Sequence, residues 1–401
     1  MQHTPTQRTP DGAPPARAPW WARRRLAGVA LASALALAAC GGPSGPGGPG
    51  GPGGPGTLTT YLLLDSWTGR SVAVMSSDDE VGELAFERNV IVGFDAHPCG
   101  MAIGPDGRVY VTDYQNARVI VLDRDALLDG SATGDARLAT IELTGFTQTC
   151  GVAFDAAGNM WVADRQGATN EVSQPNVLAQ YAAAAVAGAT GTVGLEPIRT
   201  LQPVHNTAGI TPETILASWW INMLAFDADD RLWYVDRWRS TVSRIDEPSA
   251  YPLGANVAVD PDMQLTSAPQ VGETPPVPFL TIPYSVAFDG AGNVYIGMSG
   301  QPTALRYAVD DLPSEGRTFV LPAATLTLAI AQAGGPHGPR AVTVDAEGSL
   351  WTASNTGNLL LQVRSAATRD GSITPDRVTT WGTSSGGTFG ASFVWTTRAS
   401  P

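Results

Sequence analysis

Residues able to do chemistry are few in this chain. Its 401 residues include three cysteines and four histidines, and its 24 basic residues are all arginines. The lack of lysine excludes a Schiff base and a lysine nucleophile. The sequence contains neither a His-Glu-x-x-His zinc motif nor a phosphate-binding loop. A functional site must therefore be found from the positions that side chains take in the fold.

The composition favours a turn-rich, acidic protein. Its 45 glycines and 31 prolines predict many turns and an all-β fold rather than long helices. The formal net charge is -13. Because such a surface repels phosphate backbones and anionic headgroups, we expect no nucleic-acid partner and no docking of the protein surface on a membrane.

The N-terminal segment has the layout of an export signal. Three arginines at 23–25 precede the apolar run 26–39, which ends in Leu-Ala-Ala before Cys40. This layout resembles the lipobox of bacterial lipoproteins. The resemblance implies a signal peptide at 1–39, a lipidated Cys40 that opens a Gly/Pro-rich tether at 40–56, and a folded domain at 57–401. It also implies anchoring through the Cys40 acyl chains only, to the outer membrane in a Gram-negative organism and to the cell surface otherwise.

One pattern recurs five times after residue 95. Each copy has an apolar strand, an Asp/Gly turn and a strand that carries an aromatic residue, and the copies begin at Cys99, Cys150, Asn222, Tyr284 and Arg340. Alternation with a period of two marks both halves as strands. Repeats of four short strands are typical of a β-propeller. We therefore predict an all-β propeller, with the insertion at 182–202 in an outer loop.

These motifs resemble NHL repeats over nearly all of the chain from residue 57, which implies blades of four strands. The segments 61–65 and 71–75 match the second and third strands of a repeat, but no first strand precedes them. The segment 389–393, near the other end of the chain, matches that missing strand. We predict a six-bladed propeller in which the C-terminal strand joins the N-terminal blade and closes the ring, leaving no exposed sheet edge.

Comparing the copies separates architecture from site. A residue type that recurs at one register is expected to serve the fold, whereas a register whose occupant varies is the better site candidate. The second strands carry recurring aromatics, predicted to pack between blades: Tyr61, Tyr110, Trp161, Trp233, Tyr295 and Trp351. They end in recurring aspartates, predicted to accept backbone N–H groups: Asp65, Asp113, Asp164 and Asp236.

The variable register is the first residue of each innermost strand, which in a propeller lies at the mouth of the central channel. Its occupants are Phe389, Cys99, Cys150, Asn222, Tyr284 and Arg340. Nearby loops add His97, Phe146, Trp219, Trp220 and His337 before first strands, and Trp67, Tyr114, Arg237 and Trp238 after second strands. Aromatic and cationic groups on one face suit a protein, peptide or glycan ligand. Side chains that only cap the channel and pack its loops would give the same pattern.

Cys99 and Cys150 share this register in neighbouring blades. In an oxidising compartment the pair is expected to form a disulfide, provided that the channel mouth is narrow. The alternative is a pair of buried thiols that pack as small apolar side chains.

Two enzyme families resemble this architecture. Propeller lactonases hold a metal through carboxylates and an asparagine at first-strand starts, and Asn222 is similar to that asparagine. Arg340, Tyr284 and the two cysteines, however, stand where Asp or Glu is required. Streptogramin lyases use a histidine base with magnesium, and His97 and His337 lie on the expected face without a matching motif. We therefore favour a binding module without a metal or cofactor. The alternative is a metal-assisted lyase or lactonase-type hydrolase at the channel mouth, using calcium or magnesium.

Overall fold

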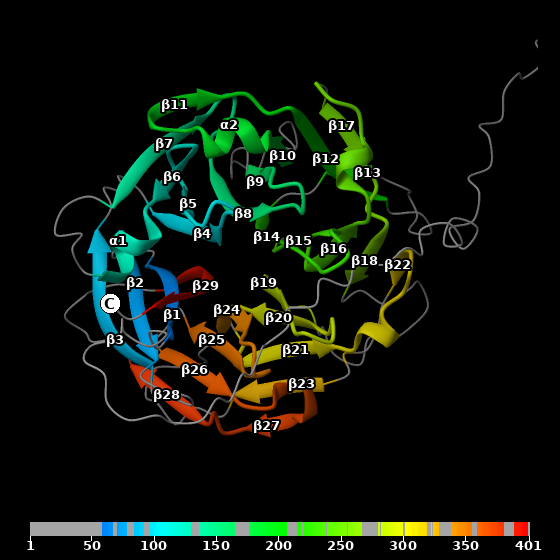
Figure 1. Ribbon diagram of the computed structural model, residues 1–401. Coiled ribbons are helices and arrows are strands. Elements are labelled where there is room, and N and C mark those ends of the chain that lie inside the picture. The colour runs from blue at the N-terminus through cyan, green and yellow to red at the C-terminus, as the bar shows by residue number, and fades with distance from the viewer. Residues whose placement is uncertain are drawn as a thin grey trace, which may run out of the picture. The chain divides into compact units, whose positions relative to one another are not determined.

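Six β-sheets make up the computed structural model (Figure 1), and they are antiparallel apart from a short parallel strand at the outer edge of four of them. The structure describes residues 58–399 except those at 67–69, 78–83, 92–96, 130–135, 165–175, 207–214, 218–219, 238, 255, 267–279, 281, 300, 319–321, 323, 329–337, 355–358 and 381–388. The predicted signal peptide, Cys40 and the tether lie outside these residues. No helix in the described part has the length and apolar character needed to cross a membrane.

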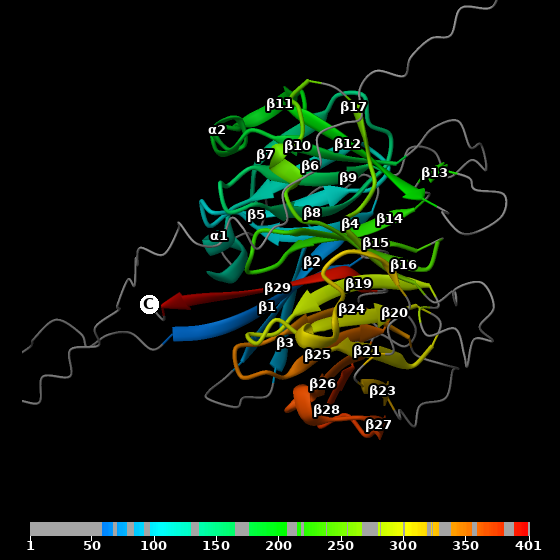
Figure 2. The same ribbon diagram turned by 90° about the vertical axis from the view of Figure 1, so that its right-hand side faces the viewer.

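One sheet joins the first and the last described strands of the chain. Its strands, in spatial order, are β29 (Phe389–Ala399), β1 (Leu58–Ser66), β2 (Ser71–Ser77) and β3 (Leu84–Ile91). The ladder between β1 and β29 runs from Leu58 opposite Ala399 to Ser66 opposite Phe389. The two strands lie side by side and extend from the rest of the sheet (Figure 2).

The other five sheets are formed by successive segments. The first has β4 (Pro98–Ile103), β5 (Val109–Asp113), β6 (Arg118–Leu122) and β7 (Arg137–Leu143), with α1 (Arg124–Asp129) between β6 and β7. The second has β8 (Thr149–Phe154), β9 (Met160–Asp164), β10 (Val177–Tyr181), β12 (Arg199–Asn206) and β13 (Ile215–Ala217).

The remaining three repeat the same order. They contain β14 (Ile221–Phe226), β15 (Leu232–Asp236), β16 (Thr241–Ile245) and β18 (Met263–Thr266); then β19 (Pro283–Phe288), β20 (Val294–Met298), β21 (Thr303–Tyr307) and β23 (Ala324–Leu328); then β24 (Pro339–Val344), β25 (Leu350–Ser354), β26 (Leu359–Val363) and β28 (Arg377–Thr380). The innermost strands contact one another in the order β29, β4, β8, β14, β19, β24 and back to β29. The prediction of an all-β propeller is confirmed.

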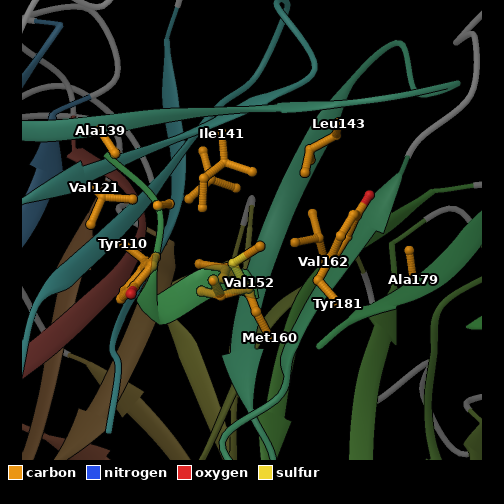
Figure 3. Close-up of a cluster of buried hydrophobic side chains, with 13 residues drawn as sticks. Tyr110, Val121, Ala139, Ile141, Leu143, Val152, Met160, Val162, Ala179 and Tyr181 are labelled. Carbon is orange, nitrogen blue, oxygen red and sulfur yellow. The ribbon is translucent and has the colours of Figure 1, made fainter. Parts of the chain in front are cut away.

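The core lies between neighbouring sheets. Apolar side chains from facing sheets interdigitate there, which removes them from water on both sides. The cluster between the sheets that begin with β4 and β8 is shown in Figure 3; among its buried residues are Tyr110, Val121, Ile141, Val152, Met160, Val162 and Tyr181. Such interfaces recur around the molecule, so each sheet is stabilised by its two neighbours.

Five of the six recurring aromatics belong to this core, and each of the five also makes a hydrogen bond to a carboxylate in the preceding turn. The indole N–H groups of Trp161, Trp233 and Trp351 donate to Asp155 (3.0 Å), Asp227 (2.7 Å) and Asp345 (2.7 Å). The hydroxyl of Tyr295 donates to Asp289 at 3.2 Å, and that of Tyr110 donates to Asp106 at 2.8 Å. The packing role predicted for these five aromatics is what the structure shows; the side chain of Tyr61 is half-buried against a neighbouring core cluster.

Short parallel strands link successive sheets at their outer edges. Four such strands leave their own sheet and pair with the preceding one: β11 (Gly191–Leu195) with β7, β17 (Asn256–Val259) with β12, β22 (Gly316–Thr318) with β18, and β27 (Gly371–Ile373) with β23. The expectation of an outer loop at 182–202 was therefore wrong. That segment contains α2 (Ala183–Ala187), β11 and the start of β12, because β11 completes the hydrogen bonding of an otherwise open sheet edge.

Candidate functional site

A β-bulge fixes the mouth register in each of the five successive sheets. In β19, Pro283 pairs with Met298 and Ser285 pairs with Gly297, so Tyr284 is the extra residue. In β24, Arg340 is the extra residue in the same way. Shifts at the same place enclose Cys99, Cys150 and Asn222. A bulge re-aims a side chain away from the regular alternation of a strand. The residues predicted for the channel mouth therefore occupy one structurally distinct register.

Two glycines let the inner strands approach closely behind this register. A Cβ atom on Gly151 would lie 2.6 Å from the backbone nitrogen of Leu224 and 2.8 Å from the carbonyl oxygen of Asn222. A Cβ atom on Gly100 would lie 2.7 Å from the carbonyl oxygen of Cys150. All three distances are too short for any side chain, so glycine at these positions allows the inner strands to pack closely.

A disulfide closes the side of the mouth formed by β4 and β8. Cys99 and Cys150 are bonded, with their Cα atoms 4.8 Å apart, and both are fully buried. Tyr114 packs against the pair, and its hydroxyl donates a hydrogen bond to the Gln148 side chain at 2.9 Å. The carbonyl of His97 accepts a hydrogen bond from the Tyr114 backbone at 2.8 Å. This side of the mouth is therefore occupied by internal contacts.

The opposite side of the mouth holds two arginines on one tyrosine. The guanidinium carbon of Arg340 lies 4.0 Å from the centroid of the Tyr284 ring, and that of Arg237 lies 5.4 Å from it. Arg237 also lies 5.1 Å from the centroid of Trp220. Tyr284 is 1% exposed. The aromatic rings thus orient guanidinium groups by cation–π contact instead of offering open faces to a ligand.

Arg237 is a partly buried cation without a carboxylate partner in the described part of the chain. Its Nε atom is buried and makes no hydrogen bond there. Burial lowers the pKa of Arg237, and the nearby hydroxyl of Tyr114 partly opposes that shift. An arginine stays protonated despite such a shift, so it places a positive charge at the mouth.

The aspartates that end the second strands are engaged within the fold. Asp113 pairs with Arg118 at 2.7 Å. Asp164 accepts hydrogen bonds from the backbone of Gln148 and of the residue before it, and Asp236 accepts one from the Arg239 backbone at 3.0 Å. Their buried carboxylates are therefore used by loops and neighbouring side chains. The prediction that these aspartates accept hydrogen bonds from backbone N–H groups is confirmed for Asp164 and Asp236. The Asp113 carboxylate instead accepts from the side chains of Asn116 and Arg118.

Asn222 lies between the two sides of the mouth. Its side chain is fully buried, yet neither its oxygen nor its nitrogen has a hydrogen-bond partner among the described residues. A buried amide without partners costs about 1–3 kcal/mol, so such groups are retained where water or a ligand satisfies them. Asn222 is therefore the described mouth residue with the most unused hydrogen-bonding capacity.

The structure brings together a subset of the predicted site residues. Cys99, Cys150, Asn222, Tyr284 and Arg340 share the mouth register, and His97, Tyr114 and Trp220 lie next to it. Phe389 begins β29, where its backbone pairs with Ser66. Trp67, Trp219, Trp238 and His337 lie outside the described residues. Gln148, which binds Tyr114, was not predicted, and its only signal in the sequence is its place two residues before Cys150.

No cluster of three or more His, Cys, Asp or Glu side chains in the described residues could hold a metal ion. A Cys, an Asn, a Tyr and an Arg at the mouth do not form the oxygen-rich ligand set that calcium or magnesium prefers. The groups at the mouth that can bind a ligand are the guanidinium groups of Arg237 and Arg340 and the side-chain amide of Asn222.

Comparison with known proteins gives one partial family match. A model described as strictosidine synthase-like, N-terminal, matches residues 327–361. Among curated proteins, none matches the chain in sequence.

Several solved structures are similar to the chain. The periplasmic gluconolactonase of Pseudomonas aeruginosa is 16% identical, with a TM-score of 0.49 over 80% of this chain and 83% of that chain. A protein of unknown function from Bacteroides caccae is 11% identical, with a TM-score of 0.47 over 83% and 97%. A catalytically inactive virginiamycin B lyase from Staphylococcus aureus is 10% identical, with a TM-score of 0.40 over 77% and 82%. None of these similarities assigns an activity or a ligand to this chain.

Proposed function

We propose that this protein is a binding propeller that takes a protein, peptide or glycan ligand at its channel mouth. The observation that carries the proposal is the unused hydrogen-bonding capacity of Asn222 on β14. The neighbouring strand β15 is followed by Arg237, a cation that has no carboxylate partner in the described part. Buried polar groups are rarely left unpaired where the fold alone decides. A ligand that completes these bonds would explain why they are kept.

The proposal includes a six-bladed, NHL-like ring closed by its own ends. The sheet that combines β29 with β1–β3 is the sixth of the six sheets, and β29 contacts the inner strands on both sides of it. A closed ring holds its mouth residues at fixed positions, which lowers the entropy cost of binding.

The proposal also includes export and lipid anchoring through Cys40, with residues 1–39 removed and residues 40–56 acting as a tether. Two or more acyl chains give stable anchoring, at about 0.8 kcal/mol per buried CH₂. Cys40→Ser should move the protein from the membrane to the soluble fraction of fractionated cells. Membrane association that is unchanged in Cys40→Ser would contradict the anchor.

Binding can be tested with the Cys40→Ser chain on arrays of bacterial glycans and peptides. We expect a defined set of ligands, with binding reduced in a further Arg340→Gln variant. Arg124→Gln is the matched control, because Arg124 lies away from the mouth and pairs with its neighbour Asp125 on the surface. Equal binding by all three proteins, or no ligand on either array, would overturn the proposal.

The rival function is a metal-assisted lyase or lactonase-type hydrolase that uses Asn222 and a histidine. Metal analysis of the purified protein separates the two functions. Stoichiometric calcium or magnesium that is lost in Asn222→Ala would support the enzyme and overturn the binding module as the primary role.

A further inference from the structure

The outer strand β28 differs from the outer strands that a parallel strand covers. Each covering strand comes from the connection between the third and fourth strands of the next sheet, and these connections are residues 182–198, 246–262, 308–323 and 364–376. The corresponding connection for β28 joins β2 to β3. Because Ser77 pairs directly with Leu84, only residues 78–83 are left for it, far fewer than in the other connections. No strand of the described part pairs with the outer side of β28, which lies at the rim of the ring (Figure 1).

The outer strand β3 is a different case. No described strand covers it either, but the connection that would do so, residues 123–136, is long. It reads Gly-Ser-Ala-Thr at 130–133, close to the Gly-Ser-Ile-Thr at 371–374 that contains β27. Its helix α1 also buries Leu127 and Leu128 in the core between the sheets of β3 and β4. The shortness of the corresponding connection is therefore specific to β28.

Three of the four covering strands also cover the outer ends of the cores between sheets. Val193 and Leu195 on β11 pack against the core between the sheets that begin with β4 and β8. Val259 on β17 and Ile373 on β27 belong to the corresponding cores further round the ring, where they are 1% and 4% exposed. The described residues of the core between the sheets of β24 and β1 come only from β1, β2 and β24–β26. The outer end of that core thus lacks the aliphatic residue that a covering strand supplies elsewhere.

Val378 on β28 is exposed at the register that a covering strand would bury. It is 46% exposed and is one of four exposed large apolar side chains in the described part. At the same register in two covered sheets, Thr140 and Gln264 lie opposite the covering residues Thr192 and Arg317 and are only 5% and 3% exposed. An open strand edge also carries N–H and C=O groups that can pair with another strand.

The covering strands of the chain itself indicate what kind of segment fits. All four pair in parallel with the strand that they cover. Three of them contain a small residue followed by an aliphatic one, in Val-Gly-Leu at 193–195, Val-Ala-Val at 257–259 and Gly-Ser-Ile at 371–373. The aliphatic residue is the one that enters the core. A segment that covers β28 should follow the same pattern.

We propose that the outer edge of β28 binds an extended segment of another protein, which adds to the sheet as a parallel strand and carries a small residue followed by an aliphatic one. Main-chain hydrogen bonds would supply affinity, and the aliphatic side chain at the outer end of the core between the sheets of β24 and β1 would supply specificity. The edge lies at the rim of the ring, whereas the channel mouth is formed by the inner strands. This interaction is therefore separate from ligand binding at the mouth.

A fluorescently labelled peptide with the sequence of residues 190–196, which includes β11, tests the proposal by anisotropy titration with the Cys40→Ser chain. The control is the same peptide with Val193→Pro and Gly194→Pro. Because the N–H groups of consecutive residues point to opposite sides of a strand, this change removes one from the pairing side in either orientation. The parent peptide should bind at least about tenfold more tightly than the control. Equal binding of the two peptides, or binding of neither, would overturn the proposal.

Variants of the protein locate the peptide. Val378→Lys should weaken the parent peptide about tenfold or more, because a charged side chain on an edge strand opposes pairing. Leu253→Lys is the matched control, because Leu253 is also an exposed aliphatic residue, at 65%, but lies between β16 and β17. Both variants should keep the melting temperature of the parent protein within a few degrees. Equal binding by the parent protein and both variants would place the peptide elsewhere, for example on β7 in exchange for β11, and would overturn the proposal.

Analytical ultracentrifugation tests the other possible occupant, a second copy of this chain. A parent protein that sediments as a monomer, as Val378→Lys does, would support an edge that is open to another protein. A dimer that Val378→Lys converts to a monomer and Leu253→Lys does not would assign the edge to a second copy and overturn the proposal. Binding of array ligands that depends on Arg340 would stand under either result, so failure of this inference is distinguishable from failure of the proposed function.

Discussion

The inner strands β4, β8, β14, β19 and β24 differ at their two ends. The bulged residue at the start of each strand changes from strand to strand, whereas the turn after each strand repeats a hydrogen bond from an aromatic side chain to a carboxylate. The variable end carries the bulged mouth residues, such as Asn222 and Arg340. The constant end carries the turn carboxylate that accepts from an aromatic, as Asp155 does from Trp161. The two ends of these strands are therefore built differently, so substitutions at the two ends should have different consequences for stability.

The constant end should be the more sensitive to large-to-small substitution. Trp161→Ala would empty a fully buried site and remove the indole that binds Asp155. We expect a loss of about 3–5 kcal/mol in the free energy of unfolding, measured by denaturant titration. Trp161→Phe, which keeps most of the ring, should cost clearly less. A loss below about 1 kcal/mol for Trp161→Ala would contradict the structural role.

The disulfide is the one feature of the variable end that should matter greatly for stability. Cys99 and Cys150 are separated by 51 residues, and the chain-entropy model gives about 4 kcal/mol for closing such a loop. The double variant Cys99→Ala and Cys150→Ala should lose a comparable amount in denaturant titration. Wild-type protein treated with reductant provides the control. If neither the double variant nor the reduced wild-type protein loses stability, the disulfide does not stabilise the fold.

Close approach of the inner strands predicts an intermediate effect. Gly151→Ala places a Cβ atom against backbone atoms of the neighbouring strand, which cannot give way as a side chain can. We expect a loss of about 1–3 kcal/mol, read from the denaturation midpoint. Gly194→Ala is the matched control, because no atom lies within 4 Å of a Cβ at that position. Equal losses in the two variants would show that the loss of stability does not come from crowding of the added Cβ atom at residue 151.

The smallest effect on stability is expected for an arginine at the variable end. Arg340→Gln removes a cation–π contact with Tyr284, worth about 0.5–1 kcal/mol at a partly exposed site. Calorimetry should therefore show a melting temperature within a few degrees of the parent value. A collapse of the fold in Arg340→Gln would place this residue among the architectural ones and weaken the distinction between the two ends.

Acid pH should act on the constant end. Burial alone would raise the pKa of Asp155, but hydrogen bonds from Trp161, Asn159 and Gln180 outweigh it and hold the pKa below its usual 3.8. A depressed carboxyl pKa contributes stability that is present above the unfolded pKa and lost as the pH falls through the folded value. This bond should therefore weaken only below about pH 4.

Much of the fold could be predicted because its signals are local. Alternation, turn glycines and an aromatic eleven residues after each mouth residue locate three strands of every copy, and the mouth register follows from alignment of the copies. The turn carboxylates were missed although their signal is present: Asp155, Asp227, Asp289 and Asp345 each stand six residues before an aromatic. In the first copy Gly104 holds that place, and Asp106 supplies the carboxylate instead.

The site was less predictable because it depends on contacts between sheets. Nothing local in the sequence says that Arg237 and Arg340 meet on one ring, or that Asn222 has no hydrogen-bond partner among the described residues. The short parallel strands were not predicted from the sequence for the same reason. A segment of three to five residues such as β22 or β11 carries too little pattern to be recognised, and its partner lies in another sheet.

These parallel strands also set an order of events for the folding chain. Because β11, β17, β22 and β27 each pair with the preceding sheet, that sheet keeps an open edge until the next repeat has been added. An open edge is a template for pairing with other chains. A growing chain would therefore have its sheet edges covered one at a time, each only after the next repeat has been made. Aggregation is most favoured in the period before the last repeat is complete.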